Sequence, residues 1–320
     1  NVDMKMHVRG KSVFVDDIIT PESCLYCALI TSPIAKGILK KADYTEVLKY
    51  PGVVKVITAN DIPGKNQIGH MAPDQPMFAE KNLEYIGQPI ALVVAKTRKI
   101  AERARKLVKL EYDELEPVLD PKIAFSQGLV HSPRRIMTVG NTTEAFKNCA
   151  VICEGTITSG PQEHFYFETQ RALAIPIEDN KIKVCASSQA PGAFHHHIAE
   201  ILGIPMNKVE FDIRRLGGGF GGKESTAVWV VAPALAAKLL NRPVKLILDR
   251  NEDIATSGKR HGYVYDYKIG LDAEGNILSY EIDLYQHAGA CADISLAVLG
   301  RSFLHTCGAY RIPNFKATAV

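Results

Sequence analysis

The sequence predicts an α+β protein, in which short strands and helices alternate along a chain of 320 residues. Hydrophobic residues make up 46% of the chain, which is enough to bury more than one core, so two domains are expected. The apolar residues fall in short runs, some alternating as in strands and some spaced as in helices, separated by glycine and proline. We expect a first domain at 1–116, a linker at 117–142 and a second domain at 143–320.

The charge balance argues against a nucleic-acid protein. Lysine and arginine number 38 against 35 acidic residues, so the formal net charge is only +3 and no basic face is available to gather phosphates. No apolar run approaches the roughly 20 residues of a membrane span, and no charged and then apolar leader opens the sequence. A cytoplasmic protein that does not contact membranes is therefore expected. The seven cysteines, an odd number in apolar stretches, predict buried free thiols.

The first domain is expected to mix strands and helices. Pro51 and Gly52 end a helical run, and the turn residues 60–64 open a loop that reaches residue 78. Cys24 and Cys27 form a C-x-x-C pair, but no second pair follows, so a buried strand is preferred to a metal site. The expected strands are 24–30, 53–58, 90–95 and 109–112, and the expected helices are 42–50 and 100–109.

The linker at 117–142 is expected because proline, glycine and serine gather there with little periodicity. The second domain then follows the same α+β pattern, with a probable hairpin around residues 272–276. His195, His196 and His197 open a helix, where neighbours point about 100° apart, so they are not expected to share one metal ion. The expected strands are 151–159, 165–169, 209–216, 244–249, 263–271 and 277–285, and the expected helices are 143–146, 198–202, 227–240, 251–253 and 296–307.

The glycine-rich stretch 216–224, with the sequence LGGGFGGKE, lies between an expected strand and an expected helix. Glycine permits positive φ and lets a ligand approach the main chain, because no Cβ stands in the way. Successive amides of such a turn can donate hydrogen bonds to an anion or an oxo group. We refer to residues 216–224 as the glycine loop.

Two nucleotide-binding motifs fit the glycine loop in part. Gly217, Gly219 and Gly222 satisfy G-x-G-x-x-G, and Asp249 after the next strand would be the acid that binds a ribose, so an NAD-dependent dehydrogenase stays open. A P-loop is disfavoured because Glu224 stands where a Ser or Thr hydroxyl would bind Mg²⁺. A non-catalytic assembly module also stays open.

Three stretches together, residues 160–169, 186–189 and 217–224, resemble the molybdenum-cofactor-binding part of the xanthine dehydrogenase and aldehyde oxidase family. The resemblance implies an α/β-hammerhead domain at 1–116 and the first, incomplete part of a molybdenum-binding domain at 143–320. It also implies that Gln189 hydrogen-bonds an oxygen ligand of the metal and that the main chain at Phe220 and Gly221 lines the molybdopterin. No residue of this chain is expected to bind the metal directly.

The resemblance also bears on the residues that precede the expected strand at 165–169. Glu163 and His164 are adjacent, and neighbours on a strand point to opposite faces, so a structural role is preferred to an acid and base pair. Gln162 and Glu168 are polar residues at the two ends of this stretch. They are expected to hydrogen-bond either the pterin or the backbone.

Glu224 implies the xanthine dehydrogenase branch, which uses a glutamate here to bind the purine, whereas aldehyde oxidases typically carry a neutral residue. The implied function is hydroxylation of hypoxanthine, xanthine or a similar N-heterocycle with oxygen derived from water, with an aldehyde oxidase-like enzyme as the alternative. The general base is expected beyond residue 320, in a further part of the molybdenum subunit. Iron-sulfur centres and FAD are expected on other parts or subunits of an oligomer, so the chain alone is expected to be inactive, with little or no bound cofactor.

Overall fold

The computed structural model describes residues 3–69, 71–225 and 227–320. The chain divides into two compact units, and each unit is built from two stretches of sequence. The first unit holds the residues up to Pro117 together with His164–Gly258. The second unit holds Val118–Glu163 together with Lys259–Val320. These units cut across the sequence division at 1–116, 117–142 and 143–320, because each unit takes strands from both halves of the chain.

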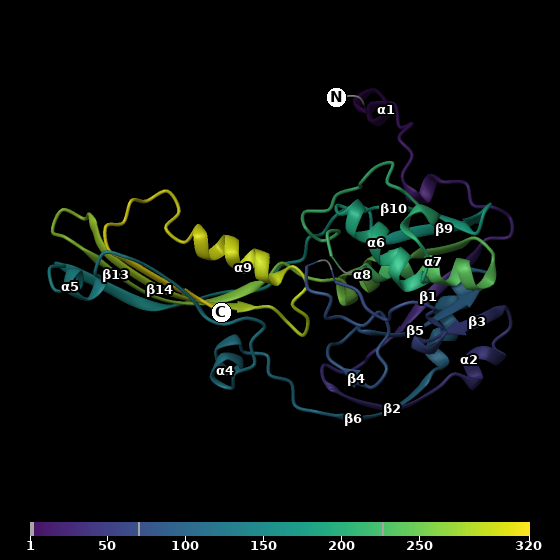
Figure 1. Cartoon of the computed structure of the whole chain (residues 1–320), viewed down its shortest axis with the longest axis horizontal. Helices are drawn as coiled ribbons and strands as arrows, with labels where there is room; N and C mark the ends of the chain where they lie inside the picture. The colour runs from purple at the N-terminus through teal and green to yellow at the C-terminus, as the bar shows by residue number, and fades with distance from the viewer. Residues whose placement is uncertain (1–2, 70, 226) are drawn as a thin grey trace. The chain divides into compact units, whose positions relative to one another are not determined.

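A seven-stranded sheet forms the centre of the first unit, with the order β11-β10-β9-β12-β1-β5-β3 (Figure 1). Strand β1 lies between β12, to which it is parallel, and β5, to which it is antiparallel. The strands are β1 (Leu25–Thr31), β3 (Val53–Ile57), β5 (Pro89–Ala95), β9 (Arg171–Ile177), β10 (Lys181–Ala186), β11 (Val209–Asp212) and β12 (Val244–Ile247).

The side chains of β5 pack into a separate hydrophobic core on each face of the sheet. All seven of its residues are buried, which matches its unbroken apolar sequence. Leu92 and Val94 belong to the core that contains helices α6 (Pro191–Leu202) and α7 (Val228–Leu240). Ala91 and Val93 face the opposite side, toward a second core that includes residues of α2 (Thr45–Lys49) and α3 (Arg98–Ala104).

Smaller elements complete the first unit. A three-stranded sheet has the order β4-β2-β6, with β2 in the middle. The glycine loop follows β11 and precedes α7. It therefore lies after the carboxyl end of β11, the strand at one edge of the seven-stranded sheet. The remaining elements are α1 (Met4–Val8), β2 (Gly37–Asp43), β4 (Asn82–Leu83), β6 (Lys109–Glu114), α8 (Arg250–Thr256), η1 (Val15–Asp17), η2 (Ala59–Asp61), η3 (Arg105–Leu107) and η4 (Met206–Lys208).

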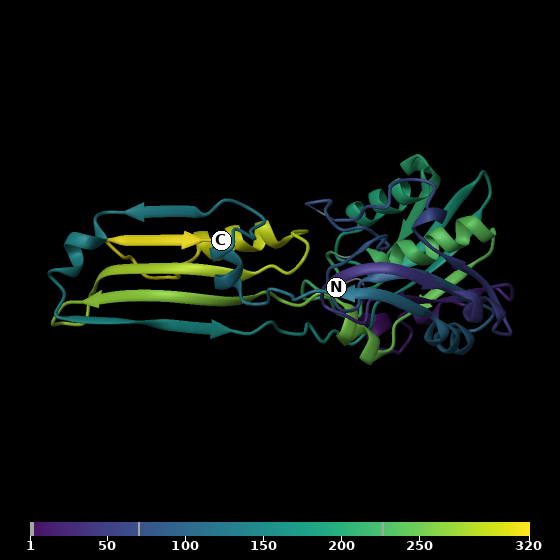
Figure 2. The same cartoon turned by 90° about the horizontal axis from the view of Figure 1, so that it is seen from below.

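The second unit is a five-stranded sheet, whose strands lie side by side in the order β7-β15-β14-β13-β8 (Figure 2). Residues of helix α9 pack with apolar side chains of β13, β14 and β15 in one core. The elements are α4 (Pro121–Ser126), β7 (Arg135–Val139), α5 (Thr142–Phe146), β8 (Val151–Ser159), β13 (Gly262–Leu271), β14 (Ile277–His287), α9 (Ser295–Leu304) and β15 (Phe315–Ala319).

Several expected elements differ from those observed. The strand expected at 165–169 is absent, because Phe165 has a φ of +50°, which is incompatible with extended backbone. The helix expected at 42–50 begins only at Thr45, because the preceding residues belong to β2. The segment expected as a linker contains α4 and β7. Strand β7 is specified by its pairing with β15, a partner distant in sequence, and not by any local alternation.

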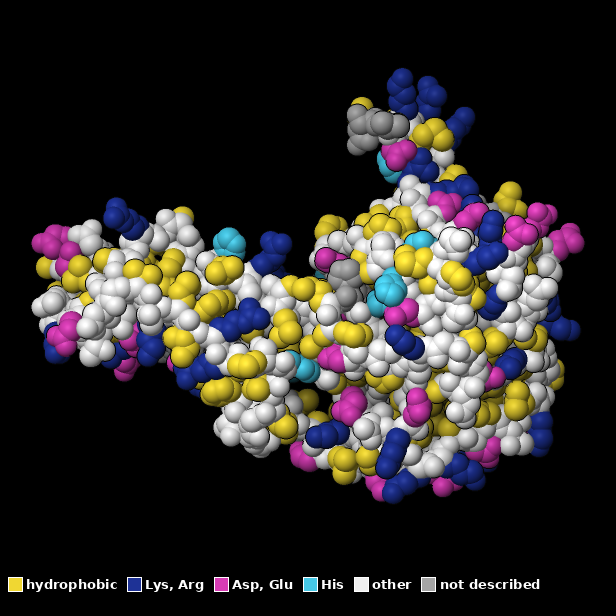
Figure 3. Space-filling view, viewed as in Figure 1, with side chains coloured by type: hydrophobic (Ala, Val, Ile, Leu, Met, Phe, Trp, Pro, Cys, Tyr) yellow, Lys and Arg dark blue, Asp and Glu magenta, His cyan; other side chains and the backbone are white. Residues whose placement is uncertain are grey.

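Positive and negative side chains are interspersed on the visible face of each unit, and no extended basic patch is seen there (Figure 3). This distribution agrees with the small net charge and offers no electrostatic footprint for nucleic acid on that face. Within the described residues, every helix is too short or too polar to span a lipid bilayer.

Candidate functional site

The glycine loop packs against two other segments of the first unit. One is the irregular segment 164–170, and the other is Ser187–Gln189 at the end of β10. The sequence places these segments tens of residues apart. The structure brings together Gln189, Phe220 and Gly221, the three residues predicted to contact the cofactor, at this junction.

Close packing favours glycine at two positions of the loop. A Cβ on Gly219 would lie 2.4 Å from Oε1 of Gln189, and one on Gly222 would lie 2.6 Å from Cε1 of Tyr166. Gly221 has a φ of +94°, a conformation that side chains disfavour. The backbone of the loop therefore packs directly against the side chains of Gln189 and Tyr166.

Three phenylalanines near the loop expose their rings. Phe220 and Phe165 both have positive φ, at +54° and +50°, which is uncommon for residues with a bulky side chain. Their side chains are 75% and 67% exposed, and that of Phe167 is 95% exposed. Strained backbone of this kind persists where the surrounding structure fixes it, and it clusters at functional sites.

Gln189 is tied to the loop through one end of its amide. Its Oε1 atom accepts hydrogen bonds from the backbone N–H of Gly221 (2.9 Å) and of Lys223 (3.3 Å), and its own backbone N–H donates to the Lys223 carbonyl (2.8 Å). Because two N–H donors need an oxygen acceptor, the amide orientation is fixed. The Nε2 group of this exposed side chain then has no hydrogen-bond partner among the described residues, so it is free to donate.

The loop itself adds further donors. Among the described residues, the backbone N–H groups of Gly218, Gly219 and Phe220 have no hydrogen-bond partner. Consecutive unpaired amides form a concave donor surface that suits an anionic or oxygen-rich ligand. With the Nε2 group of Gln189, they make the junction an acceptor-binding site.

The side chain of Lys223 points away from this donor surface and into the protein. It is fully buried, with Nζ 2.9 Å from the hydroxyl of Ser187, 3.5 Å from the carboxylate of Glu168 and 4.6 Å from the ring centre of Tyr166. Burial lowers the pKa of Lys223 to about 8, against the opposing effect of Glu168. A P-loop lysine must reach the phosphates, so the P-loop interpretation does not match this geometry.

Glu168 binds the backbone of the loop, which is one of the two roles expected for it. Its Oε2 atom accepts from the N–H of Gly217 (2.9 Å), and its own N–H donates to the Gly217 carbonyl (2.9 Å). Gln162 lies in the second unit, where its backbone exchanges hydrogen bonds with Arg260. Glu163, also in the second unit, forms an ion pair with Lys259 (2.9 Å).

A buried network behind the loop was not expected from the sequence. The hydroxyl of Tyr166 and the backbone N–H of Gln170 donate to the two carboxylate oxygens of Asp253, each at 2.6 Å. The side-chain amide of Gln170 donates to the Gly222 carbonyl at 2.7 Å. Burial raises the pKa of Tyr166, so its phenol stays protonated and keeps donating. Asp253 lies more than 80 residues further along the chain, so no local pattern could have revealed the network.

Glu224 follows Lys223 directly and has an exposed side chain. Glu224 lies outside the first turn of the helix that follows the loop, because α7 begins at Val228 and residues 220–225 form a turn and a bend. The helix dipole therefore gives no reason for its charge. Among the described residues, its carboxylate has neither an ion-pair nor a hydrogen-bond partner, so it is available to a ligand.

The acidic residue and the strand order that a dinucleotide-binding site requires are not found around the glycine loop. Asp249 caps α8, accepting from the N–H of Glu252 at 2.8 Å, and is used structurally. Strands β11 and β12, which flank the glycine loop and α7, are separated in the sheet by β10 and β9. In a dinucleotide-binding βαβ unit, the strand after the helix lies beside the strand before the loop.

His195, the first residue of the histidine run, hydrogen-bonds backbone carbonyls. Nε2 of His195 lies 2.9 Å from the carbonyl of Met206 and 3.0 Å from that of Val209. The described part of the chain contains no cluster of three or more His, Cys, Asp or Glu side chains that could hold a metal ion.

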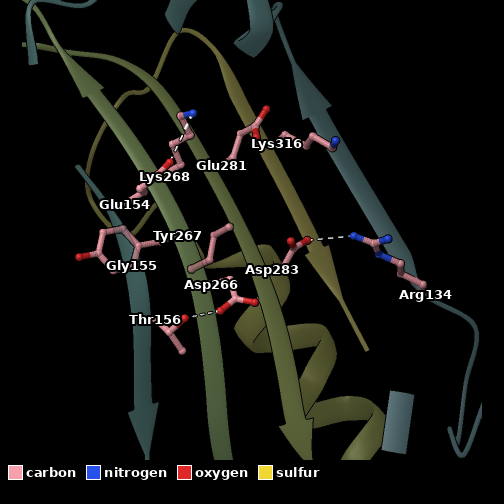
Figure 4. A pocket seen from close by; sticks show the side chains of 11 residues that line it. Arg134, Glu154, Gly155, Thr156, Asp266, Tyr267, Lys268, Glu281, Asp283 and Lys316 are labelled. Carbon is pink, nitrogen blue, oxygen red and sulfur yellow. Dashed lines mark hydrogen bonds and ion pairs between the residues drawn. The ribbon is translucent and has the colours of Figure 1, made fainter. Parts of the chain in front are cut away.

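The second unit contains an open pocket of about 550 Å³ on its sheet (Figure 4). Four of its charged residues are paired with one another: Arg134 with Asp283 at 3.0 Å, and Lys268 with Glu154 at 3.4 Å. Such partly exposed pairs are typical of a solvated sheet face. The pocket includes none of the predicted site residues.

Two family models match the chain. One is described as "Aldehyde oxidase and xanthine dehydrogenase, a/b hammerhead domain" and matches residues 9–116. The other is described as "Molybdopterin cofactor-binding domain" and matches residues 130–320. Together they account for nearly the whole chain and include the glycine loop.

The curated relatives agree with the family models. Xanthine dehydrogenase of Oryza sativa subsp. japonica is 37% identical over 316 residues, which cover 97% of this chain and 23% of the relative. Aldehyde oxidase 2 of Cavia porcellus is also 37% identical over 316 residues, with the same shares covered. The chain thus spans about a quarter of the length of the curated relatives it matches.

Solved structures share the fold. Aldehyde oxidoreductase from Desulfovibrio gigas superposes with a TM-score of 0.89 at 24% identity, over 98% of this chain and 37% of that one. Quinoline 2-oxidoreductase from Pseudomonas putida 86 gives 0.84 at 22% identity, over 98% and 42%. The α+β fold, with a hammerhead domain followed by a molybdopterin cofactor-binding domain, is confirmed, and the chain belongs to the xanthine dehydrogenase and aldehyde oxidase family of molybdenum hydroxylases.

Proposed function

We propose that this chain is the cofactor-binding portion of a xanthine dehydrogenase-like enzyme that hydroxylates hypoxanthine, xanthine or a similar N-heterocycle with oxygen derived from water. One observation carries the proposal: Glu224 presents an exposed carboxylate in the same glycine loop that presents the three unpaired amides. An acceptor for the substrate and donors for the cofactor thus belong to one short stretch of chain. Neighbouring Lys223 is turned inward, so it does not neutralise Glu224.

The donor surface fits molybdopterin and the oxygen ligands of its metal. Gln189 would donate through Nε2 to an oxygen ligand, and the main chain at Phe220 and Gly221 would line the cofactor. When bound, the cofactor supplies the redox chemistry of hydroxylation. The chain contributes preorganised donors, whose positions are set before any ligand arrives.

The substrate assignment follows from the chemistry of a carboxylate. A purine presents ring N–H groups that can donate to Glu224, whereas the carbonyl oxygen of an aldehyde would be repelled by it. Loss of this hydrogen bond should therefore affect the two substrate classes in opposite directions. Aldehyde oxidase 2 of Cavia porcellus is as similar to this chain as the rice xanthine dehydrogenase, which keeps an aldehyde oxidase-like enzyme as the second candidate.

The other parts of the enzyme belong to the same proposal. We assign the general base to the part of the molybdenum subunit beyond residue 320, and iron-sulfur centres and FAD to other parts or subunits of an oligomer. The seven cysteines are free thiols, the form expected in the reducing cytoplasm, where we place the enzyme. The expectation that they are buried is wrong for four of them, because Cys153 is exposed and three others are only partly buried. Turnover then requires those parts, and this chain by itself is expected to be inactive.

Parallel kinetics on the full-length enzyme test the substrate assignment. We expect Glu224→Val to lower turnover of hypoxanthine or xanthine by on the order of 100-fold, the scale of a lost hydrogen bond to a charged group, and to keep or improve aldehyde turnover. Glu22→Val is the matched control, because Glu22 is another exposed glutamate of the first unit. Equal losses on both substrates would make Glu224 structural, and a wild-type preference for aldehydes would establish the second candidate.

A further inference from the structure

The two ends of the glycine loop meet at one buried ion pair. Oε2 of Glu168 accepts the backbone N–H of Gly217, at the start of the loop, and lies 3.5 Å from Nζ of Lys223, at its end. The Lys223 side chain is completely buried, and that of Glu168 is 6% exposed. A single carboxylate oxygen thus links the first and last turns of the loop.

Lys223 also connects the loop to Gln189 in three ways. Its backbone N–H donates to the Gln189 side chain, its carbonyl accepts from the Gln189 backbone, and its Nζ donates to Ser187, two residues earlier. Any movement of residue 223 therefore moves the acceptor and donor that orient the Gln189 amide. Residue 223 therefore joins the loop to Gln189, together with the N–H of Gly221.

This ion pair is not an obvious source of folding stability. Removing two charges from water is costly, and buried pairs are often no better for stability than apolar residues of the same volume. Oε1 of Glu168 is also buried without a hydrogen-bond partner among the described residues. Because burying this ion pair costs free energy, its role is better explained by the position that it imposes on the glycine loop.

We propose that the Glu168–Lys223 pair holds the glycine loop closed on Gln189, and that Lys223 is a positioning residue for the cofactor contact made by Gln189. The inference rests on the proposed function for the role of Gln189. The loop closure itself does not depend on that function. The two parts can therefore be tested separately.

Hydrogen exchange in the full-length protein tests the closure. We expect Lys223→Met to accelerate exchange of the hydrogen-bonded amides of residues 217, 221, 223 and 189 by about tenfold or more, since a hydrogen bond to a charged group is lost. Lys245→Met is the matched control, because Lys245 is another buried lysine of the first unit, paired with Asp16 at 3.1 Å. Its effect on the loop should stay below about twofold. Equal acceleration in both variants would overturn the proposal.

If Lys223→Met does not fold, a double variant tests the same proposal. Glu168→Gln/Lys223→Met removes both charges, and the new glutamine oxygen can still accept from Gly217, so folding should survive. We expect its loop amides to exchange at least tenfold faster than wild type, because Nζ no longer joins residue 223 to Ser187. Wild-type protection in the double variant would overturn the proposal.

The split between kinetic parameters tests the positioning role. Because the Glu224 side chain itself is retained, we expect Lys223→Met and the double variant to lower kcat for purines and aldehydes alike, with KM changed less than about threefold. Loss confined to purine KM would overturn the positioning role of Lys223. Wild-type enzyme that contains no molybdenum would refute the proposed function, whereas the exchange result would still report on loop closure.

Discussion

Replacing Gly219 by alanine should displace Gln189 with little effect on the rest of the fold. The new Cβ would lie 2.4 Å from Oε1 of Gln189, where an ordinary contact is 3.4 Å or more. The nearest atoms belong to the end of a flexible, exposed side chain, which can move. The backbone at Gly219 is not in the left-handed region, so the added Cβ introduces no conformational strain.

The magnitude follows from the contacts that would be lost. Oε1 must withdraw by about 1 Å, which breaks its hydrogen bonds to Gly221 (2.9 Å) and Lys223 (3.3 Å). Each contributes about 1 kcal/mol net, and water can replace part of this, so the free energy of unfolding should fall by about 1–2 kcal/mol. Turnover of the full-length enzyme should fall by on the order of 100-fold, because a preorganised donor leaves the site.

Urea denaturation, metal analysis and steady-state kinetics measure these effects. Gly192→Ala is the control: a Cβ there meets nothing within 4 Å, and alanine is the better helix former near the start of α6. It should leave turnover unchanged. A stability loss above about 4 kcal/mol for Gly219→Ala would show that Gln189 cannot move aside. Wild-type turnover with full molybdenum content would refute the link between the Gln189 contacts and the cofactor.

The remaining predictions concern Gln189 and Lys223. Gln189→Ala should lower turnover by on the order of 100-fold while lowering the free energy of unfolding by only about 1–2 kcal/mol; unchanged turnover with full cofactor occupancy would remove Gln189 from the site. The pKa of Lys223 is about 8 in the folded protein and 10.5 unfolded, so the unfolded state binds more protons between these values and stability rises with pH there. Denaturation at pH 7.5 and 10.5 should show this rise, about 3 kcal/mol, in wild type but not in Lys223→Met. An equal rise in both proteins would contradict the assignment to Lys223.

Local patterns in the sequence predicted the elements whose burial is regular along the chain. The unbroken apolar run of β5, the alanine-rich α7 and the hairpin β13–β14 all lie close to the expected positions. The segment 165–169 misled for a physical reason. Its three consecutive aromatic residues favour a strand, but Phe165 adopts positive φ and Arg250 binds the carbonyls of Tyr166 and Phe167, which a strand would need for pairing.

The candidate site was predictable where it depends on backbone and not where it depends on distant side chains. The glycines indicated a loop whose backbone is approached closely by other groups. In the structure, the Gln189 side chain contacts this loop. The inward turn of Lys223 could not be read from the sequence, because it depends on Glu168 and Ser187, which are brought to the loop only by the fold.

The seven-stranded sheet has a consequence for how the protein is made. Strand β1 gains its parallel neighbour only when Val244 pairs with Leu25, after most of the chain has left the ribosome. At about 5–20 residues per second, more than ten seconds separate the emergence of these two strands. During that interval β1 is the edge of an unfinished sheet, and its Leu25, Cys27 and Leu29 lack the helices that bury them. We therefore expect chaperones to bind the nascent hammerhead region. A protein truncated at the boundary between the two family models would lack β12, so the edge of β1 would stay unpaired.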